Sequence, residues 1–283
     1  MEVTTEVRET RRLLREARQK GCRIGCVPTM GALHAGHLSL IEECRKSVDF
    51  VLVTIFVNPT QFGPSEDLER YPRPLAQDLN SCEHVQVDAV FTPEIPTLYP
   101  EGFDTWVECG EISGILEGAS RPGHFRGVTT IVAKLLNIVQ PDVACFGQKD
   151  YQQQTIIRQM VRDLNIPTEI VVCPTLREAD GLAMSSRNAY LNEQQRASAV
   201  ALHQALERAE QLLQAGEASF KDVEEAMIER LKSFDGVNPE YAVIRDPDSL
   251  QEPDEAATSV VALIAARLGQ TRLIDNRTIP ITK

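Results

Sequence analysis

The first 174 residues alternate segments of helical periodicity with short runs that are apolar throughout. Amphipathic or buried helices are predicted at 3–20, 75–83, 127–140 and 151–165, and another helix ends near residue 47. The apolar runs, rich in β-branched residues, predict strands at 23–28, 49–58, 88–93, 142–148 and 168–174. Strands that alternate with helices predict repeated βαβ units. We therefore expect an α/β fold: a Rossmann-like, doubly wound parallel sheet with helices on both faces.

The pattern changes after residue 174. A polar loop at 175–191 precedes predicted helices at 193–214 and 220–233, and two alternating or apolar strands are predicted at 239–250 and 258–269. This order is typical of a smaller α+β domain. The sequence thus predicts two domains, residues 1–175 and residues 176–283.

Composition narrows the classes of partner. The chain has 283 residues, 42% of them hydrophobic, and a formal net charge of −12. An acidic chain has no basic field to offset phosphate repulsion, so a nucleic-acid partner is not expected. No apolar run reaches 18 residues and the N-terminus lacks a signal-peptide core, so we expect no membrane association and a cytoplasmic protein.

Seven cysteines are scattered through the chain, mostly inside apolar runs. They are typical of reduced core residues. Cys22 and Cys26 leave open a half metal site, which would need a second pair of ligands.

The stretch VPTMGALHAGHLSL, residues 27–40, joins a predicted strand to a helix and carries His34 and His37. Ligands gather where strands end and helices begin in such sheets. Gly31 and Gly36 would let the backbone approach a ligand, and histidines at i and i+3 can face one phosphate. The alternative is a pair of surface or zinc-binding histidines.

In CFGQKDYQQQ, Lys149 directly follows a predicted strand, which places a cation at the same sheet edge as the histidines. Asp150 is interpreted both as a ligand contact and as the N-cap of the next helix, with Gln153 at the capping-box position.

The loop GLAMSSRNAYL carries Ser185, Ser186 and Arg187. Two hydroxyls and a guanidinium can close over a triphosphate, with bidentate bonds from the arginine. The alternative is a polar linker with an N-cap.

Two further segments carry candidate ligand groups. Asn58 and Gln61 in FVNPTQFG have amides that can bind a small substrate, although an ordinary polar loop has the same composition. Arg121, His124 and Arg126 in GASRPGHFRGV suggest a lid or anion contact, or else a solvated basic loop.

Together, PTMGALHAGH, NPTQFG, RYPR, RPGHFRGV, FGQKDYQQ and LAMSSRN follow one another in an order and spacing that resembles the pantothenate synthetase (pantoate beta-alanine ligase) family. The resemblance spans essentially the whole chain and is densest from Pro28 to Asn188. It implies membership of the HxGH nucleotidylyltransferase superfamily.

The resemblance implies a nucleotide site on matching residues. The implied ATP-contacting residues are Met30, Gly31, Ala32, Leu33, His34, Ala35, Gly36, His37, Gly147, Gln148, Lys149, Asp150, Leu176, Met184, Ser185, Ser186 and Arg187. His37 is the implied proton donor, and His34, Lys149 and Arg187 complete the implied catalytic set.

For the acceptor, the resemblance implies that Gln61 and Gln153 hold pantoate and that Gln61 also contacts beta-alanine. Asp78 is implied to help position Mg2+, with a carboxylate on the helix surface as the alternative. Two positions depart from the family pattern. The position of Gln148 is often glutamate in the family, which should matter little if its backbone does the binding. The position of Gln77 is often acidic, and this second departure weakens the assignment of Asp78 to a metal.

The implied reaction joins pantoate to beta-alanine. Pantoate attacks the α-phosphorus of ATP, giving pantoyl adenylate and pyrophosphate, and the amine then displaces AMP. The resemblance also implies a homodimer and a C-terminal domain that acts as a lid. The leading alternative is a nucleotidylyltransferase acting on another small acceptor, and a non-catalytic nucleotide sensor is a further one. A tRNA ligase is disfavoured by the acidic balance and by the lack of an evident anticodon-binding domain.

Overall fold

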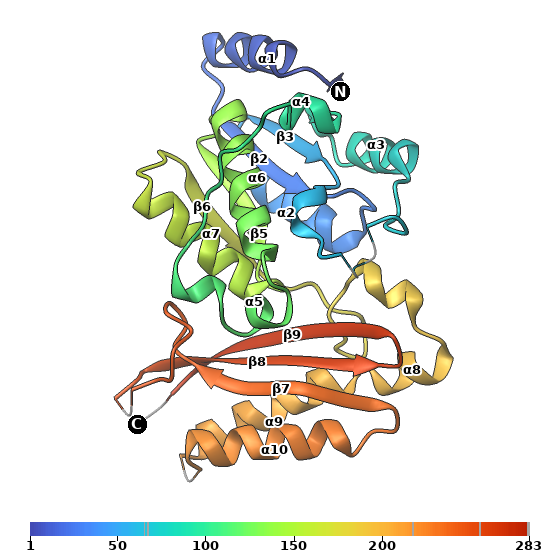
Figure 1. Cartoon of the computed structure of the whole chain (residues 1–283), viewed down its shortest axis with the longest axis vertical. Helices are drawn as coiled ribbons and strands as arrows, with labels where there is room; N and C mark the ends of the chain where they lie inside the picture. The colour runs from blue at the N-terminus through green and yellow to red at the C-terminus, as the bar shows by residue number, and fades with distance from the viewer. Residues whose placement is uncertain (65, 67, 217, 255, 282–283) are drawn as a thin grey trace. The chain divides into compact units, whose positions relative to one another are not determined.

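The computed structural model describes residues 1–64, 66, 68–216, 218–254 and 256–281, and the chain divides into two compact units (Figure 1). The first unit comprises Met1–Gly147 and Gln152–Pro174. The second comprises Gln148–Tyr151 and the residues from Thr175 onward. Segment 148–151 therefore groups with the C-terminal residues, although it follows a strand of the first unit.

The first unit is built on a six-stranded parallel sheet. Its strands are β1 (Glu2–Thr4), β2 (Ile24–Thr29), β3 (Phe50–Ile55), β4 (Ala89–Phe91), β5 (Val143–Gly147) and β6 (Glu169–Cys173). They are hydrogen bonded in the order β1-β4-β3-β2-β5-β6, and every pair is parallel. This confirms the predicted doubly wound sheet.

Helices cover both faces of this sheet, as two separate apolar clusters indicate. One cluster joins the sheet to α1 (Val7–Gln19), α6 (His124–Val139) and α7 (Tyr151–Asp163). The other joins its opposite face to α2 (Ala35–Arg45) and α3 (Leu75–His84). Short helices α4 (Ile95–Leu98), α5 (Glu117–Ser120), η1 (Pro59–Gln61) and η2 (Glu111–Ser113) lie in the connections.

The sheet has its switch point at β2, which lies between β3 and β5. In doubly wound sheets, ligands bind outside the carboxyl ends of the strands at such a point. β2 ends at Thr29 and β5 at Gly147. The histidine loop and the segment containing Lys149 are the chain segments that follow these two strand ends.

The helix predicted at residues 3–20 is wrong at its N-terminal end. Residues 2–4 form β1 instead, an edge strand that pairs with β4, and α1 begins only at Val7. Thr4 and Thr10 are joined by a buried hydroxyl–hydroxyl hydrogen bond of 2.7 Å, which links the strand to the helix. Three residues are too few for a periodic signal, so the strand was not predicted.

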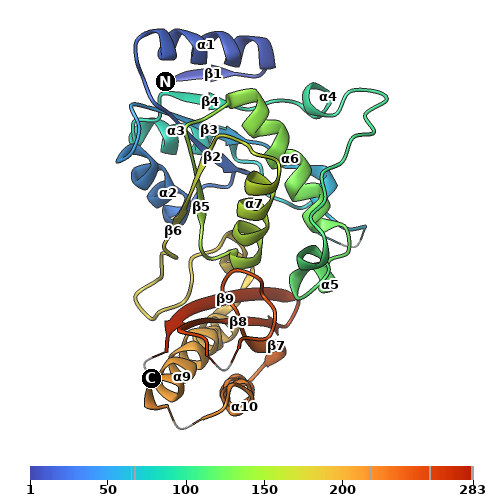
Figure 2. The same cartoon turned by 90° about the vertical axis from the view of Figure 1, so that its left-hand side faces the viewer.

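The second unit is a three-stranded antiparallel sheet with helices on one face (Figures 1 and 2). Its elements are η3 (Ser186–Tyr190), α8 (Glu193–Ser198), α9 (Ala201–Ala215), α10 (Phe220–Lys232), β7 (Val237–Arg245), β8 (Ser259–Leu268) and β9 (Thr271–Pro280). Apolar side chains of α9, α10 and the three strands share one core. This agrees with the predicted α+β unit.

Two details of the second unit differ from the prediction. The helix expected at 193–214 is interrupted at Ala199–Val200, which separates α8 from α9. The third strand, β9, was not predicted. Asp275 and Asn276 are adjacent and both buried, so the sequence TRLIDNRTIP lacks the alternation of a half-buried strand.

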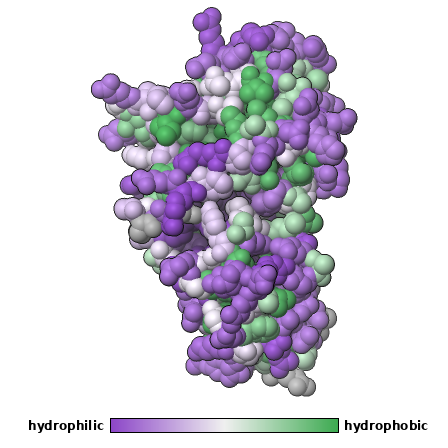
Figure 3. All heavy atoms as spheres, turned by 90° about the vertical axis from the view of Figure 1, so that its right-hand side faces the viewer, coloured by the Kyte–Doolittle hydropathy of each residue, from purple (hydrophilic) through white to green (hydrophobic). Residues whose placement is uncertain are grey.

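One face of the molecule is largely polar at its surface. On the face seen in Figure 3, hydrophilic residues predominate and apolar residues appear in small groups, as is normal for a folded protein. Within the described residues, no helix combines the length and apolar character needed to cross a membrane.

Candidate active site

The loop that follows β2 contains two consecutive residues in the left-handed region, Gly31 (φ +80°) and Ala32 (φ +50°). A Cβ at Gly31 would lie 2.9 Å from Oδ2 of Asp78 and 3.1 Å from Cγ2 of Ile55, so both conformation and space require glycine. The Thr29 hydroxyl accepts a hydrogen bond from the Gly31 amide at 3.2 Å. The chain therefore turns sharply and tightly at the end of β2.

Asp78 of α3 holds this turn. Its Oδ2 accepts a hydrogen bond from the Ala32 amide at 2.9 Å, and its Oδ1 accepts one from the Leu33 amide at 2.8 Å. Consecutive amides in such a turn form an anion-binding concavity, and here a carboxylate of the chain occupies it. Asp78 is 2% exposed, so the alternative of a helix-surface carboxylate is wrong. Its direct role toward Mg2+ stays a prediction.

The two histidines begin α2. His34 is the N-cap residue, and its Nδ1 accepts a hydrogen bond from the Gly36 amide at 3.1 Å. The Nδ1 of His37 accepts one from the His34 amide at 3.4 Å. The ring centroids are 4.2 Å apart. The predicted placement of both rings on one side of the helix start is therefore observed. The two rings also cap the helix, which was not predicted.

These hydrogen bonds define what the rings can donate. A neutral imidazole that accepts at Nδ1 carries its hydrogen on Nε2. His34 and His37 can thus each present an Nε2–H donor at the N-terminus of α2. Helix N-termini favour anions because of their unpaired amides and the helix dipole.

Gln61 ends η1 and is held by the residues around it. The Asn58 amide nitrogen donates to Oε1 of Gln61 at 3.1 Å and to the Gly127 carbonyl at 3.2 Å. Nε2 of Gln61 lies 2.9 Å from Sδ of Met30, as donor to a sulfur acceptor. The structure therefore brings together a residue predicted to bind pantoate and one predicted to bind ATP.

Asn58 is 1% exposed and its other amide atom is also used. Its Oδ1 accepts hydrogen bonds from the Thr60 hydroxyl at 3.0 Å and from the Tyr99 hydroxyl at 2.8 Å. Burial raises the pKa of Tyr99, which keeps this donor protonated. Asn58 is therefore an anchor for Gln61; the expectation that both amides face a substrate is not met.

The segment RPGHFRG also holds the loop that carries Gln61. Nδ1 of His124 lies 2.7 Å from the Gln61 carbonyl, to which it donates, and the Arg121 guanidinium lies 3.0 Å from Nε2 of His124. Arg121 also pairs with Glu66 at 2.6 Å. Partial burial alone would raise the pKa of Glu66, but the Arg121 guanidinium outweighs it and the pKa is lowered. The alternative of a solvated basic loop is wrong for Arg121 and His124.

Arg126 differs from its two neighbours in this segment. It is exposed, and its guanidinium lies 4.9 Å from the ring centroid of Trp106. This stacking against an aromatic ring fits a surface position.

Gln153, the second predicted pantoate residue, lies on α7 and is half-buried. The preceding Gln152 is 3% exposed, accepts a hydrogen bond from the Glu117 amide at 2.9 Å and donates to the Ile112 and Ile115 carbonyls. Of these two adjacent glutamines, one is fully used inside the unit.

Of the remaining predicted residues, Gly147 ends β5 in the first unit and the others belong to the second unit. Lys149 has a side chain that is 18% exposed, and its Nζ lies 3.9 Å from Oδ1 of Asp150. The backbone carbonyls of Gln148 and Lys149 both accept hydrogen bonds from the side-chain amide of Asn276 on β9, at 3.0 and 2.9 Å. N-capping by Asp150 stays a prediction.

The polar loop 175–191 is ordered by its own backbone pairing. Arg177 and Ala183 form an antiparallel bridge, and the Met184 amide donates to the Leu176 carbonyl at 3.0 Å. Ser185 then caps η3, because its hydroxyl accepts from the Arg187 amide at 3.3 Å. The predicted N-cap is therefore present in this loop. Binding of phosphate by the loop stays a prediction.

The described residues contain no group of three or more histidine, cysteine, aspartate or glutamate side chains able to hold a metal ion. All seven cysteines are free thiols. Burial raises the pKa of Cys26, which lies within the core and has no exposed surface. Cys22 and Cys26 are therefore not part of such a group.

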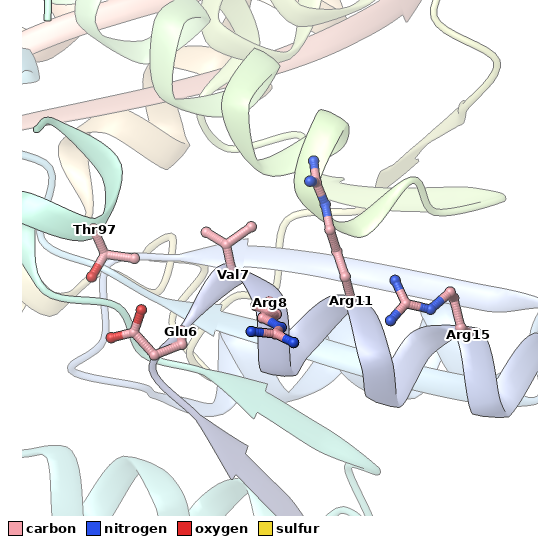
Figure 4. A pocket seen from close by; sticks show the side chains of 6 residues that line it. All are labelled: Glu6, Val7, Arg8, Arg11, Arg15 and Thr97. Carbon is pink, nitrogen blue, oxygen red and sulfur yellow. The ribbon is translucent and has the colours of Figure 1, made fainter.

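One open cavity of about 490 Å³ lies against α1 (Figure 4). It is lined by Glu6, Val7, Arg8, Arg11, Arg15 and Thr97. None of these is a predicted site residue. The Arg11 guanidinium donates to the Asn137 carbonyl at 3.2 Å, so part of this basic face fastens α1 to α6.

The chain matches one known protein family over almost its full length. The family model described as pantoate-beta-alanine ligase matches residues 2–278. The chain belongs to this family. The predicted resemblance is confirmed over almost the entire sequence.

Relatives named pantothenate synthetase match most of the chain. The pantothenate synthetase of Moorella thermoacetica is 51% identical over 276 residues, which cover 98% of each chain. That of Roseiflexus castenholzii is 53% identical over 253 residues, covering 89% of this chain and 91% of its own.

Solved structures agree. Pantothenate synthetase from Thermus thermophilus has a TM-score of 0.92 at 43% identity, covering 98% of this chain and 99% of its own. The pantoate-beta-alanine ligase of Francisella tularensis, a complex with beta-gamma ATP and beta-alanine, has a TM-score of 0.80 at 36% identity and covers 98% and 97%.

The reaction of the pantoate-beta-alanine ligase family is therefore the reaction of this chain. ATP drives the condensation of pantoate with beta-alanine through pantoyl adenylate, and AMP and pyrophosphate are released. The alternative of a nucleotidylyltransferase with another small acceptor is not favoured by these relatives.

Proposed function

We propose that this ligase reaction uses the histidine loop of the first unit and the two polar segments of the second to bind ATP. The observation that carries the proposal is the start of α2, where His34 and His37 accept at Nδ1 and so hold donors on Nε2. The proposed ATP contacts are Met30 to His37, Gly147 to Asp150, Leu176, and Met184 to Arg187.

Charge explains why these groups suit the first step. A pantoate carboxylate must approach the α-phosphorus of ATP, and two anions repel each other. Lys149, Arg187 and the two imidazole donors offset that repulsion and stabilise the charge that passes to pyrophosphate. One preorganised donor is worth about 3 kcal/mol in such a transition state. His37 is the proposed proton donor.

Gln61 and Gln153 are the proposed pantoate residues, with Gln61 also proposed for beta-alanine. Gln61 suits a positioning task because Asn58, His124 and Met30 restrict both its side chain and its backbone. Holding the carboxylate in line with the phosphorus is worth roughly 7 to 11 kcal/mol of the barrier, so a fixed amide is more useful than a mobile one.

Mg2+ is proposed to enter with ATP as part of the substrate. Asp78 fits a direct metal contact poorly, because both carboxylate oxygens already accept backbone amide hydrogens and the side chain is buried. Oxygens of the triphosphate and water are the ligands that Mg2+ usually keeps. We therefore propose that Asp78 acts on the nucleotide site through the loop that it holds.

The wider assignments rest on the family. We propose that residues 1–175 form the ATP- and pantoate-binding domain and residues 176–283 a lid domain, with 282 and 283 outside the described residues. A homodimer and a cytoplasmic location are proposed as well; free thiols at all seven cysteines suit a reducing compartment. Sedimentation equilibrium tests the dimer.

The test of the function is an assay with ATP, pantoate and beta-alanine, each omitted in turn, with AMP and pantothenate identified as products. Exchange of labelled pyrophosphate into ATP should require pantoate and not beta-alanine. Exchange that proceeds without pantoate, or with another acid in its place, would contradict the assignment of the acceptor.

A further inference from the structure

We propose that Asp275 and Asn276 of β9 are positioning residues that hold both nucleotide segments of the second unit. The inference rests on the proposed roles of Lys149 and Arg187 and adds the residues through which the fold places them. Neither residue was among those predicted from the sequence.

Asn276 holds the segment that carries Lys149. Its side-chain amide donates to two consecutive carbonyls, those of Gln148 at 3.0 Å and Lys149 at 2.9 Å. Asn276 is 3% exposed, so water cannot readily replace these bonds. One amide group that serves two neighbouring carbonyls permits only a narrow range of backbone conformations. The position of the Lys149 Cα is thereby tied to β9.

Asp275 holds the loop that carries Arg187. Its two carboxylate oxygens accept from the two terminal nitrogens of Arg177, at 2.7 and 2.9 Å. Arg177 Nη1 also donates to the Gly181 carbonyl at 2.9 Å. The same arginine is bridged to Ala183. Arg177 therefore links β9 to the hairpin of residues 177–183, which leads directly into 184–187.

Both nucleotide segments are held by neighbouring residues of β9. Asp275 and Asn276 are adjacent, and Oδ1 of Asp275 also accepts the Asn276 amide hydrogen at 2.7 Å. A shift of either residue along β9 would displace both Lys149 and the loop bearing Arg187. The geometry points to β9 as the element that sets the spacing between these two cations.

Stability alone explains this arrangement poorly. The Asp275 side chain is 1% exposed, and a buried ion pair often stabilises a fold no more than apolar residues of similar volume would. The bidentate geometry and the double amide contact instead fix directions, which apolar packing does not. Such groups fit a site in which a displacement of about 1 Å can lower the rate about 100-fold.

The first test uses Asn276→Ala and the isosteric Asn276→Asp, which would place a carboxylate against two carbonyl oxygens. For both we expect kcat/KM for ATP to fall about 10- to 100-fold, with the KM for pantoate little changed. Arg277→Ala is the matched control, since Arg277 is the next residue on β9 and pairs with Glu210 of α9. That variant should keep normal ATP kinetics.

A double-mutant cycle separates positioning from general destabilisation. If Asn276 acts through Lys149, Asn276→Ala should cost much less activity in a Lys149→Ala background than in the native chain. Arg177→Lys, which keeps a partly buried cation but loses the bidentate pair, should likewise have little further effect beside Arg187→Ala. Additive losses in both cycles would overturn the inference.

Melting curves accompany every variant. Should Asn276→Ala unfold at the assay temperature, Arg177→Lys still decides the case, because normal ATP kinetics in that folded variant contradict the proposal. Failure of the underlying function looks different: Lys149→Ala and Arg187→Ala would then react normally. Impaired Lys149 and Arg187 variants beside normal Asn276 and Arg177 variants would refute only the positioning.

Discussion

Replacing Asp78 by asparagine should loosen the histidine loop while leaving side-chain size unchanged. The native carboxylate accepts from the Ala32 amide at 2.9 Å and the Leu33 amide at 2.8 Å. Asparagine offers one acceptor oxygen, so its NH2 group would face one of these two amides. That amide would lose its partner in a site where Asp78 itself is 2% exposed.

The magnitude follows from these contacts. A hydrogen bond to a charged group contributes about 1.5 to 3 kcal/mol, and an amide left buried without a partner is destabilising by a similar amount. Ala32 also holds φ +50°, a conformation that costs about 1 to 2 kcal/mol without such support. We expect Asp78→Asn to lower the free energy of unfolding by about 2 to 3 kcal/mol.

Two measurements check this. Urea unfolding should give a lower midpoint with an unchanged slope, because the exposed area on unfolding is the same. Pyrophosphate exchange at varied ATP should show a KM for ATP raised about tenfold or more, since the loop residues 30–37 are the proposed contacts. Asp163→Asn, with a side chain 53% exposed, is the control and should unfold like the native chain.

A metal role would give a different result. If Asp78 served chiefly as a ligand of Mg2+, the unfolding midpoint would not move and excess Mg2+ would restore activity. An unchanged midpoint in Asp78→Asn would therefore refute the view that this carboxylate is a structural acceptor for the loop.

Three other predictions concern the site. His37→Ala and Lys149→Ala should each slow single-turnover adenylation by about 100-fold or more while the fold stays intact; near-normal adenylation removes that residue from the chemistry. Gln61→Ala should chiefly raise the KM for pantoate, and an unchanged pantoate dependence contradicts its assignment. The pKa of Glu66 is lowered beside Arg121, so this pair stabilises the fold at pH values above the normal glutamate pKa. That stabilisation is lost as the pH falls through the lower pKa of the folded state. Glu66→Gln should therefore weaken the fall of the melting temperature at acid pH.

The main features of the fold could be predicted because they are carried by local periodicity. Continuous apolar runs predicted β2, β3 and β5. Segments of helical periodicity between these runs predicted the helices that cover the sheet. β1 and β9 could not be predicted in this way. β1 has only three residues, and β9 buries a charged and an amide side chain at adjacent positions, so neither shows the pattern of a strand.

The site was predicted in part for the same reason. The spacing of His34 and His37 places both rings at one helix start, which is a local property. The capping bonds at Nδ1 are local too and could have been anticipated from the N-cap position of His34. The role of Asp78 could not, because its partners Ala32 and Leu33 lie 46 and 45 residues earlier.

In both units, one side chain pairs with two backbone groups of a loop that is proposed to bind the nucleotide. A loop that must approach a ligand cannot satisfy its backbone groups in a helix or sheet, so other groups have to pair with them. Asp78 takes two loop amides in the first unit, and Asn276 serves two loop carbonyls in the second. Asn276 lies 128 and 127 residues from those carbonyls. Motifs identify the residues that face a substrate, whereas the residues that hold them in place become visible only when distant elements are packed together.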